Sequence, residues 1–358
     1  MKSENNTNSG YLEKTKPLLS NSVGKKFSKV DTEKVLYDFL YPKFGERFLE
    51  YRKKYETYLT DNEHKSLPSF PVSLILELVN RCNLECVMCW QGYRNDTEKS
   101  AMDINVLKKL FSEFKEQKLD ALLLSTSETL LHKNYPEILK MAEEAGVMDQ
   151  FLFTNGTLLN EKNSKIILNS SLTRLFVSID ASSDETYDKV RIPVNKTKIN
   201  TNRLEKIEQN VKDFIKLREE SGKKIPLVRV SFVALEVNQH EIDEFVNKWE
   251  NIVDSVEIQK EGSINFYNDF EKNTENTEKK LKVYNCNQPW GQITIHSDGT
   301  VGPCCNTIGR NIPIGNIHKQ TVKEIWDGAK MNGIRSEFKN NTPNKTCQLC
   351  IENSKINY

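Results

Sequence analysis

The sequence has no long apolar run and no recognisable targeting segment. No stretch of its 358 residues approaches the roughly 20 consecutive apolar residues that a membrane-spanning helix needs. The first ten residues, Met1 to Gly10, are polar and lack the apolar core of a secretory signal. The sequence therefore predicts a cytoplasmic protein without a membrane partner.

An excess of charge of one sign is also absent. The chain has 51 Lys and Arg residues against 50 Asp and Glu residues, a formal net charge of +1. This balance provides no basic field for a nucleic-acid backbone and no acidic tail. We therefore expect no nucleic-acid partner. The composition, 37% hydrophobic and 28% charged, is typical of a globular protein.

Cysteine, in contrast, is present in two groups. Eight cysteines in a reducing compartment are poor candidates for disulfides, and clustered thiols there are more often metal-binding or catalytic. The first group has three members close together and the second has five near the C-terminus: Cys82, Cys86 and Cys89, then Cys286, Cys304, Cys305, Cys347 and Cys350. Two metal or cluster sites are therefore the leading expectation.

Apolar runs of strand length alternate with segments of helical periodicity, which is typical of a parallel β/α architecture. Apolar residues recur at helical spacing over residues 107–114 and 204–215, and Asn238 with Glu241 has the spacing of a capping box. Six runs are predicted to be strands: Ser73 to Val79, Asp120 to Ser125, Gln150 to Thr154, Arg174 to Asp180, Leu227 to Leu235 and Val253 to Gln259.

The two flanking segments differ from this α/β part. A polar start to about Lys29 precedes a helical pair up to Tyr55, so we expect a frayed tip and then a packed helical cap. Residues 269–282 are charged and rich in Asn, with almost nothing to bury. This composition is typical of a linker, and the domain boundary is expected there.

The segment after the linker is small. Two apolar runs flank Gly299 as a hairpin, and one short helix is expected around Trp326. Such a segment buries too little apolar surface to be stable without a cross-link or a metal site, which its cysteines can supply. The chain is thus predicted to consist of a tip with a helical extension, an α/β core, a linker and a cluster-binding domain: residues 1–70, 71–268, 269–285 and 286–358.

The first cysteine group directly follows the first predicted strand. Loops at the C-terminal ends of parallel strands carry the active sites of α/β folds. A structural zinc site needs four protein ligands, and none of the five histidines lies near this loop in sequence. A 4Fe-4S cluster held by three thiolates instead keeps one iron open for catalysis. A zinc site completed by a distant residue is the alternative.

The spacing Cys82-x3-Cys86-x2-Cys89 resembles the signature of the radical S-adenosylmethionine (SAM) enzymes. The resemblance implies a partial (β/α)6 barrel whose 4Fe-4S cluster has these three cysteines as ligands. It implies that SAM chelates the open iron and that an electron from the reduced cluster cleaves SAM to methionine and a 5′-deoxyadenosyl radical. That radical abstracts a hydrogen atom from the substrate. A flavodoxin- or ferredoxin-type electron donor is implied as a partner.

The resemblance also assigns SAM contacts. Glu128 stands where the family has the acid of a Gly-Gly-Glu-Pro turn, although both glycines and the proline are missing here. Simpler interpretations are a solvated loop residue for Glu128, a common Asn-Gly turn for Asn155, a helix cap for Asp180 and a surface ion pair for Arg191. The positions carried over from the family are Met88, Glu128, Asn155, Ser178, Asp180 and Arg191.

The second cysteine group supplies four thiols in the pattern Cys286-x12-Gly299-x4-Cys304, then Cys347-x2-Cys350. Four thiolates fit either a structural zinc or a fully ligated 4Fe-4S cluster, and the spacing does not separate these. The segment resembles the SPASM/Twitch extensions of radical SAM enzymes, which implies one auxiliary 4Fe-4S cluster. We assign Cys304 as a ligand and Cys305 as a spare thiol, with the reverse assignment left open.

The leading hypothesis for function is a radical SAM oxidoreductase that dehydrogenates a sugar-like or other small-molecule substrate. Its auxiliary cluster would accept an electron from the substrate radical or anchor the substrate site. A radical SAM enzyme that modifies a ribosomal peptide or protein is the first alternative, and a non-catalytic zinc protein is the second. No catalytic base is assigned, but four residues share parity on two predicted strands and are candidates to face the barrel interior: Arg229, Ser231, Glu257 and Gln259.

Overall fold

The computed structural model describes residues 24–60, 66–89, 91, 100–195, 203–261, 283–305 and 307–353. The predicted linker at residues 269–282 and most of the predicted polar tip lie outside these ranges. Within them, no helix combines the length and the apolar character that crossing a bilayer requires.

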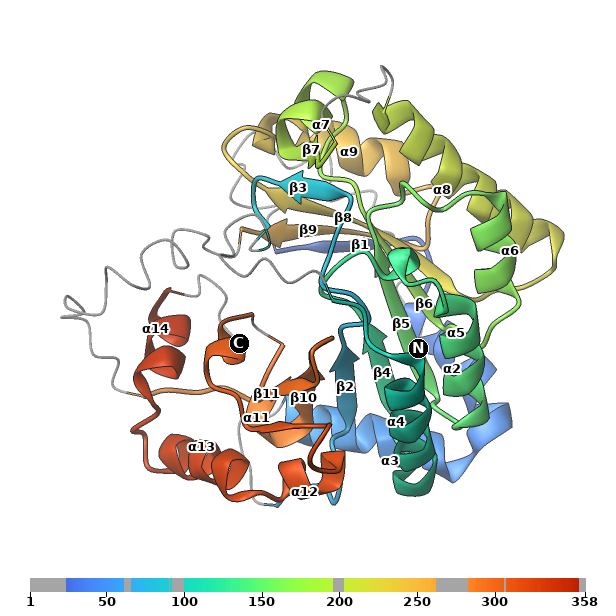
Figure 1. Ribbon diagram of the computed structural model, residues 1–358. Coiled ribbons are helices and arrows are strands. Elements are labelled where there is room, and N and C mark those ends of the chain that lie inside the picture. The colour runs from blue at the N-terminus through green and yellow to red at the C-terminus, as the bar shows by residue number, and fades with distance from the viewer. Residues whose placement is uncertain are drawn as a thin grey trace, which may run out of the picture.

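A ten-stranded sheet organises the described part of the chain (Figure 1). Its centre consists of six parallel strands in the order β9-β8-β6-β5-β4-β2, at the positions of the six predicted runs. Their bounds are β2 Ser73–Leu76, β4 Ala121–Leu124, β5 Asp149–Thr154, β6 Arg174–Ser178, β8 Leu227–Ala234 and β9 Ser255–Lys260. The short strand β1 (Lys26–Ser28) pairs antiparallel with β9. The predicted α/β fold with a partial barrel is confirmed.

Helices connect the parallel strands and cover the outer face of the sheet (Figure 1). Their bounds are α4 Ile104–Gln117, α5 Tyr135–Glu144, α6 Glu161–Leu168, α7 Asp184–Val190, α8 Arg203–Glu220 and α9 Ile242–Trp249. The predicted apolar stripes are buried, with Leu107 and Phe114 of α4 and Val211 and Phe214 of α8 all 0% exposed. Burial of these stripes is the main stabilising contribution to the layer.

The predicted capping box at Asn238 and Glu241 is wrong. Asn238 precedes a 3-10 turn, η6 (Gln239–Glu241), and its side chain makes no capping hydrogen bond. Instead its Nδ2 donates to the carbonyl oxygens of Asp180 and Val233 at 2.9 and 3.0 Å. The Glu241 carboxylate likewise accepts from a distant backbone amide. Both side chains tie the β8–α9 connection to the loop after β6, a long-range use that local spacing does not reveal.

Two helices close the N-terminal end of the barrel. They are α2 (Thr32–Phe44) and α3 (Glu46–Tyr55). Leu36 and Tyr51 of this pair are buried against Val72, immediately before β2, in an apolar cluster separate from the main core. The predicted helical extension therefore forms a cap over the strand ends opposite to the cysteine loop.

A hydrogen bond from this cap gives a stability prediction. The fully buried Tyr51 hydroxyl donates to Asp149 Oδ2 at 2.9 Å. Because the acceptor is ionised, Tyr51→Phe is expected to lower the free energy of unfolding by about 1.5–3 kcal/mol. The control is Tyr55→Phe, whose hydroxyl makes no hydrogen bond within the described residues. Urea denaturation that shows equal losses for the two variants would contradict this role of Tyr51.

The C-terminal region continues the barrel sheet. β10 (Gln292–Ile295) lies parallel to β2, with Gln292 opposite Ser73. β11 (Thr300–Gly302) and β12 (Gly315–Asn316) then extend the sheet in antiparallel fashion. The predicted hairpin is present, and its glycine has a φ of +83°. Because β10 is the immediate neighbour of β2, the C-terminal region is anchored beside the strand that leads into the first cysteine group.

The helix prediction for this region was incomplete. One short helix was expected near Trp326, whereas three helices follow the hairpin: α12 Val322–Trp326, α13 Ala329–Lys339 and α14 Lys345–Asn353. A further short helix, α11 (Gln288–Gly291), precedes it. Cys347 and Cys350 both lie on α14, and residues three apart on a helix share a face. The helix therefore presents its two thiols together.

Candidate active site

The first three thiols lie in the loop that follows β2, at the C-terminal edge of the parallel strands. Cys86 ends the short strand β3 (Leu84–Cys86), which pairs antiparallel with β7 (Arg191–Pro193) and places Cys86 opposite Arg191. Burial raises the pKa of Cys82 to about 12 and that of Cys89 to about 11. Thiolates in this loop therefore need a positive partner, which a bound metal supplies.

Asn155 connects this loop to the turn after β5. Its Nδ2 lies 3.6 Å from Cys82 Sγ and donates to Asn83 Oδ1 at 2.8 Å. The buried carboxylate of Glu128 accepts hydrogen bonds from Asn155 N and Thr154 Oγ1, each at 2.8 Å. Burial raises the pKa of Glu128 to about 7, although these hydrogen bonds oppose the shift. Both predicted residues are thus gathered next to Cys82, and Glu128 is not the solvated loop residue of the simpler interpretation.

The turn before Glu128 keeps a glycine-like backbone without glycine. Thr126 has a φ of +85°, a conformation that glycine adopts readily and other residues rarely. Such a residue costs of order 1–3 kcal/mol unless its surroundings hold it in place. Thr126 Oγ1 donates to Glu77 Oε2 at 3.0 Å, which fixes the turn. The turn therefore keeps its shape without the glycines, and Glu128 stays in contact with the turn after β5.

Arg191 and Asp180 form a buried ion pair beside Cys86. Arg191 NH2 contacts Asp180 Oδ2, and Arg191 NH1 lies 3.4 Å from Cys86 Sγ. The other Asp180 oxygen accepts from Val233 N at 2.7 Å. Two simpler interpretations are therefore wrong: Ser183, not Asp180, caps the following helix, and Arg191 is buried rather than at the surface. The pair places a guanidinium against the thiol of a predicted cluster ligand.

The ion pair predicts a large stability effect. Arg191→Met is expected to lower the free energy of unfolding of the metal-free protein by about 3–5 kcal/mol, because it leaves Asp180 buried and uncompensated. Adding Asp180→Asn to this variant removes the stranded charge and is expected to recover part of the loss. Chemical denaturation of the two variants and the parent measures this. A double variant less stable than Arg191→Met would contradict the explanation.

The remaining predicted SAM contacts are Met88 and Ser178. Met88 is half-buried between Cys86 and Cys89. Ser178 is half-buried at the end of β6, in register with Ser231 of β8. Their contacts do not single out a ligand, so both assignments stay predictions.

The second thiol site lies between the hairpin and the C-terminal helices. Four sulfur-bearing residues, Cys286, Cys304, Cys347 and Cys350, line one cavity. The rest of its wall is mostly apolar: Pro289, Pro303, Ile312, Ile334, Phe338 and Ile351. Burial raises the pKa of both Cys286 and Cys347 to about 12. Four soft ligands in an apolar cavity suit a metal centre that neutralises their charge.

Cys305 lies close to the same group. Burial and the charge of Cys350 raise its pKa to about 11, and its own charge acts on Cys286. Among the residues that the structure describes, no three Cys, His, Asp or Glu side chains are already arranged closely enough to hold an ion. The assignment of cluster ligands therefore depends on which thiols lie near one another, and the choice of Cys304 over Cys305 stays a prediction.

Comparison with protein families decides the class. A model of the radical SAM superfamily matches residues 76–249, and a model of the SPASM iron-sulfur cluster-binding domain matches residues 286–351. The chain belongs to the radical SAM superfamily. Membership implies a SAM-binding 4Fe-4S cluster, auxiliary iron-sulfur binding in the SPASM domain, and SAM itself. The donor sets described above fit both groups, so the hypothesis of a non-catalytic zinc protein is set aside.

Individual relatives of this radical SAM chain are distant. A protein named "Probable GTP 3',8-cyclase" from Methanococcus maripaludis is 30% identical over 123 residues, which is 34% of this chain and 41% of the relative. The chain thus matches about two fifths of the length of such curated relatives. SuiB from Streptococcus suis, solved with S-adenosylmethionine, is 16% identical with a TM-score of 0.58, and the match covers 86% of this chain and 83% of SuiB. The enzyme anSMEcpe, solved with bound AdoMet, is 16% identical with a TM-score of 0.56, and the match covers 78% of this chain and 84% of anSMEcpe.

The inner face of the radical SAM barrel carries the polar residues whose parity was noted. Arg229 NH1 lies 2.7 Å from Glu257 Oε2, and Gln259 Nε2 donates to the same oxygen at 2.9 Å. The Arg229 guanidinium sits 3.5 Å from the centre of the Phe176 ring. On the opposite face of β8, Phe232 packs against a helix. The predicted alternation is therefore correct, and a charged, hydrogen-bonding surface lines the concave side.

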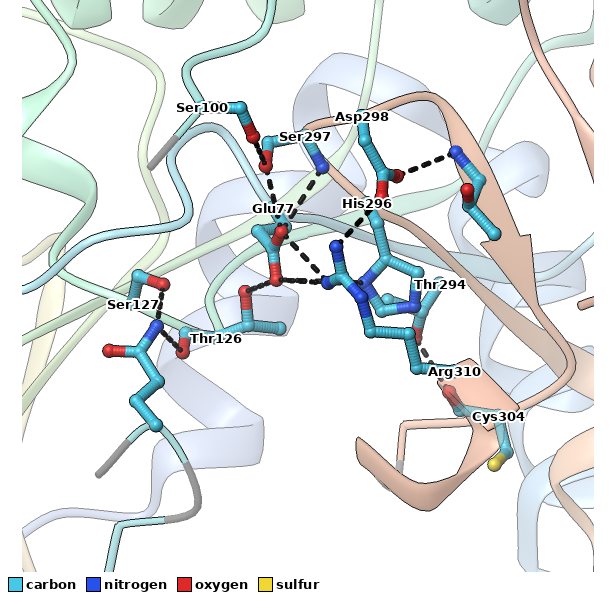
Figure 2. Close-up of polar contacts among 12 residues, drawn as sticks. Glu77, Ser100, Thr126, Ser127, Thr294, His296, Ser297, Asp298, Cys304 and Arg310 are labelled. Carbon is cyan, nitrogen blue, oxygen red and sulfur yellow. Dashed lines mark hydrogen bonds and ion pairs between the residues drawn. The ribbon is translucent and has the colours of Figure 1, made fainter. Parts of the chain in front are cut away.

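A polar cluster that the sequence did not reveal lies where the end of β2 meets the C-terminal region (Figure 2). It centres on Glu77, directly after β2, with Arg310 and His296 from the C-terminal region. A lone Glu after a strand and a His at a hairpin carry no functional signal in sequence. Their proximity follows from the parallel pairing of β2 with β10, which local patterns do not predict.

Proposed function

We propose that this radical SAM enzyme dehydrogenates a small, polyhydroxylated substrate, and that its auxiliary cluster takes up the second electron. The observation that carries the proposal is the direct parallel pairing of β10 with β2. This pairing anchors the C-terminal region, which carries the four-thiol cavity, next to the strand that leads into the loop with the three thiols. A substrate held at the mouth of the barrel would therefore have an electron acceptor in the region attached to the neighbouring strand.

The redox steps balance with these two sites. When bound, the reduced three-thiolate cluster supplies one electron that splits SAM into methionine and the 5′-deoxyadenosyl radical. The substrate would give a hydrogen atom from its carbinol carbon to that radical. The radical would thereby become 5′-deoxyadenosine, and the substrate would become a carbon radical. The auxiliary cluster that the C-terminal thiols would hold would accept the remaining electron, the hydroxyl proton would pass to solvent or a base, and the alcohol would become a ketone. One electron would thus be used at the three-thiolate cluster to cleave SAM, and one electron from the substrate would be left on the auxiliary cluster.

Residues of the chain contact the thiols of the first site and line the surface proposed to bind the substrate. Arg191 NH1 and Asn155 Nδ2 direct positive or polar N–H groups at Cys86 and Cys82, which stabilises charge on those sulfurs. On the concave face, Glu257 offers a carboxylate and Arg229 a guanidinium for hydroxyl groups. This surface supports a small polar substrate better than an apolar one.

A second candidate is modification of a peptide. SuiB from Streptococcus suis was also solved with its precursor peptide SuiA, and this chain shares that fold with a TM-score of 0.55 at 17% identity. Against a peptide, the five cysteines of the C-terminal group supply one four-thiolate auxiliary cluster but not two. The helical N-terminal cap also resembles no strand-rich peptide-binding module.

The test uses anaerobically reconstituted full-length protein with SAM and dithionite. A panel of cyclitols and sugars deuterated at each carbinol carbon is compared with peptides of mixed sequence. We expect one panel alcohol to transfer deuterium into 5′-deoxyadenosine and to yield ketone in equal amount. Deuterium transfer from a labelled peptide, with none from any alcohol, would replace the first proposal by the second.

A further inference from the structure

A buried ionic cluster joins the rim of the barrel to the loop that carries Cys304 (Figure 2). Glu77 is 0% exposed. Its carboxylate accepts hydrogen bonds from Ser297 N and Ser297 Oγ at 3.1 and 2.9 Å. It also lies 3.2 and 3.3 Å from Arg310 NH1. A carboxylate at the end of a barrel strand is thus fully engaged by the C-terminal region.

The charge state of Glu77 is fixed by these contacts. Burial alone would raise the pKa of Glu77, but His296 and Arg310 outweigh burial and hold the pKa at about 2. Glu77 is therefore ionised throughout the neutral range. A negative charge therefore lies inside the protein, directly after β2 and in contact with Arg310 of the C-terminal region.

His296 lies between this ion pair and the auxiliary loop. The Nδ1 atom of His296 lies 3.0 Å from Arg310 NH1 and 3.5 Å from Glu77 Oε2. Nε2 is buried and has no hydrogen-bond partner among the described residues. A Cβ added to Gly302 would lie 3.3 Å from it. The unpaired ring nitrogen thus faces the strand that runs into Cys304, and a buried polar atom without a partner costs about 1–3 kcal/mol.

Strand β10 and the turn that carries Arg310 both contact the loop that carries Cys304. Thr294 of β10 lies two residues before His296, and its Oγ1 donates to the Cys304 carbonyl oxygen at 2.7 Å. Arg310 belongs to the turn η7 (Thr307–Asn311). In that turn, Gly309 approaches so closely that an added Cβ would lie 2.7 Å from Cys304 Sγ. A shift of Arg310 or His296 would therefore move the Cys304 loop.

The cluster also reaches the first thiol loop. Thr126, which donates to Glu77, directly precedes Ser127. Gln91, two residues beyond Cys89, donates from Nε2 to the Thr126 carbonyl oxygen at 3.4 Å and contacts Ser127 Oγ. A continuous series of polar contacts therefore runs from the SAM-site loop through Glu77 to the auxiliary loop.

We propose that Glu77 is a positioning residue for the auxiliary cluster, which it serves by fixing the Cys304 loop through Arg310 and His296 and by setting the cluster's reduction potential with its charge. The inference rests on the auxiliary site of the proposed function and not on the substrate. Potentials of iron-sulfur clusters depend on nearby charge and on hydrogen bonds to sulfur. Removal of the buried negative charge favours the reduced cluster, which carries one more electron.

The experiment isolates the auxiliary cluster in the full-length chain by replacing Cys82, Cys86 and Cys89 with alanine. An EPR-monitored redox titration then measures its potential. In this background Glu77→Gln is expected to shift the potential to a more positive value. Glu77→Asp keeps the charge and is expected to stay near the parent value.

The matched control is Asp298→Asn. Asp298 pairs with NH2 of the same Arg310 at 2.9 Å, but its side chain is 43% exposed. Solvent and salt screen that charge, so its removal is expected to leave the potential near the parent value. Iron content per chain is measured for every variant, because it reports whether the loop still holds the cluster.

The outcomes separate the role of Glu77 from that of the cluster itself. An unchanged potential in Glu77→Gln, or an equal shift in Glu77→Asp, would overturn the inference. Loss of auxiliary iron from Glu77→Gln with retention in Glu77→Asp would support it, and loss from both would overturn it. A background protein without any auxiliary cluster contradicts the proposed function instead.

Discussion

Replacing Cys86 with alanine is expected to reduce 5′-deoxyadenosine formation by more than about 100-fold, beyond the range typical for residues that only support a metal ligand. Cys86 is the most buried of the three thiols, and it alone receives the Arg191 guanidinium, 3.4 Å from its sulfur. Its loss leaves two thiolates in the loop, too few to hold a 4Fe-4S cluster with a single open iron. Chromatographic assay of 5′-deoxyadenosine with SAM and dithionite measures the effect.

The control for this loss is a variant of the auxiliary site under the same conditions. Cys347→Ala leaves the loop after β2 intact and is expected to keep SAM cleavage. If wild type and Cys86→Ala cleave SAM at the same rate, the ligand assignment for the first loop is wrong.

Cys347→Ala is expected to stop product formation while SAM cleavage continues. The thiol of Cys347 lies in the apolar cavity with those of Cys286, Cys304 and Cys350, so its loss opens a four-thiolate site. Without a complete auxiliary cluster, the substrate radical loses its electron acceptor. Product is expected to fall by more than about 100-fold, while 5′-deoxyadenosine is still made in an abortive reaction.

The measurement is the ratio of oxidised product to 5′-deoxyadenosine. In wild type the ratio is expected to be near one, and in Cys347→Ala near zero. A conservative comparison is Ile351→Val, which trims an apolar side chain of the same cavity wall without removing a ligand. A normal ratio in Cys347→Ala would show that the second thiol site is not required for oxidation.

The barrel was predictable because its signals are local. Each parallel strand is a short apolar run, and the helical stripes at Leu107 and Phe114 recur at helical spacing. The three-cysteine loop was equally visible in the sequence, since its cysteines lie within eight residues and shortly after a strand. Parity along a strand also sufficed to place Arg229 and Glu257 on one face.

What the sequence did not predict depends on contacts between distant segments. The pairing of β10 with β2 joins residues on opposite sides of the barrel domain in sequence, and Glu77 and His296 meet only because of it. Asn238 was misassigned for the same reason, because its side chain donates to the Asp180 carbonyl oxygen in the β6–α7 connection instead of capping its own helix. Local spacing carries no information about such partners.

The thiols of Cys304 and Cys305 illustrate a different limit. They are adjacent, both half-buried, and both lie near the remaining thiols of the site. Spacing from Gly299 favours Cys304, whereas the charge contacts of Cys286 include Cys305. Iron content and EPR of the two single alanine variants distinguish them, because only the ligand variant loses the auxiliary signal.

The most direct test asks whether SAM binds the iron of the three-thiolate cluster. A full-length variant with Cys286, Cys347 and Cys350 replaced by alanine keeps only that cluster, which is reduced and mixed with SAM labelled with 17O in the carboxylate or 15N in the amino group. Hyperfine coupling of either label to the cluster, detected by pulsed electron-nuclear double resonance, is the predicted result. A spectrum that SAM leaves unchanged, with coupling to a fourth ligand from the protein, would contradict it.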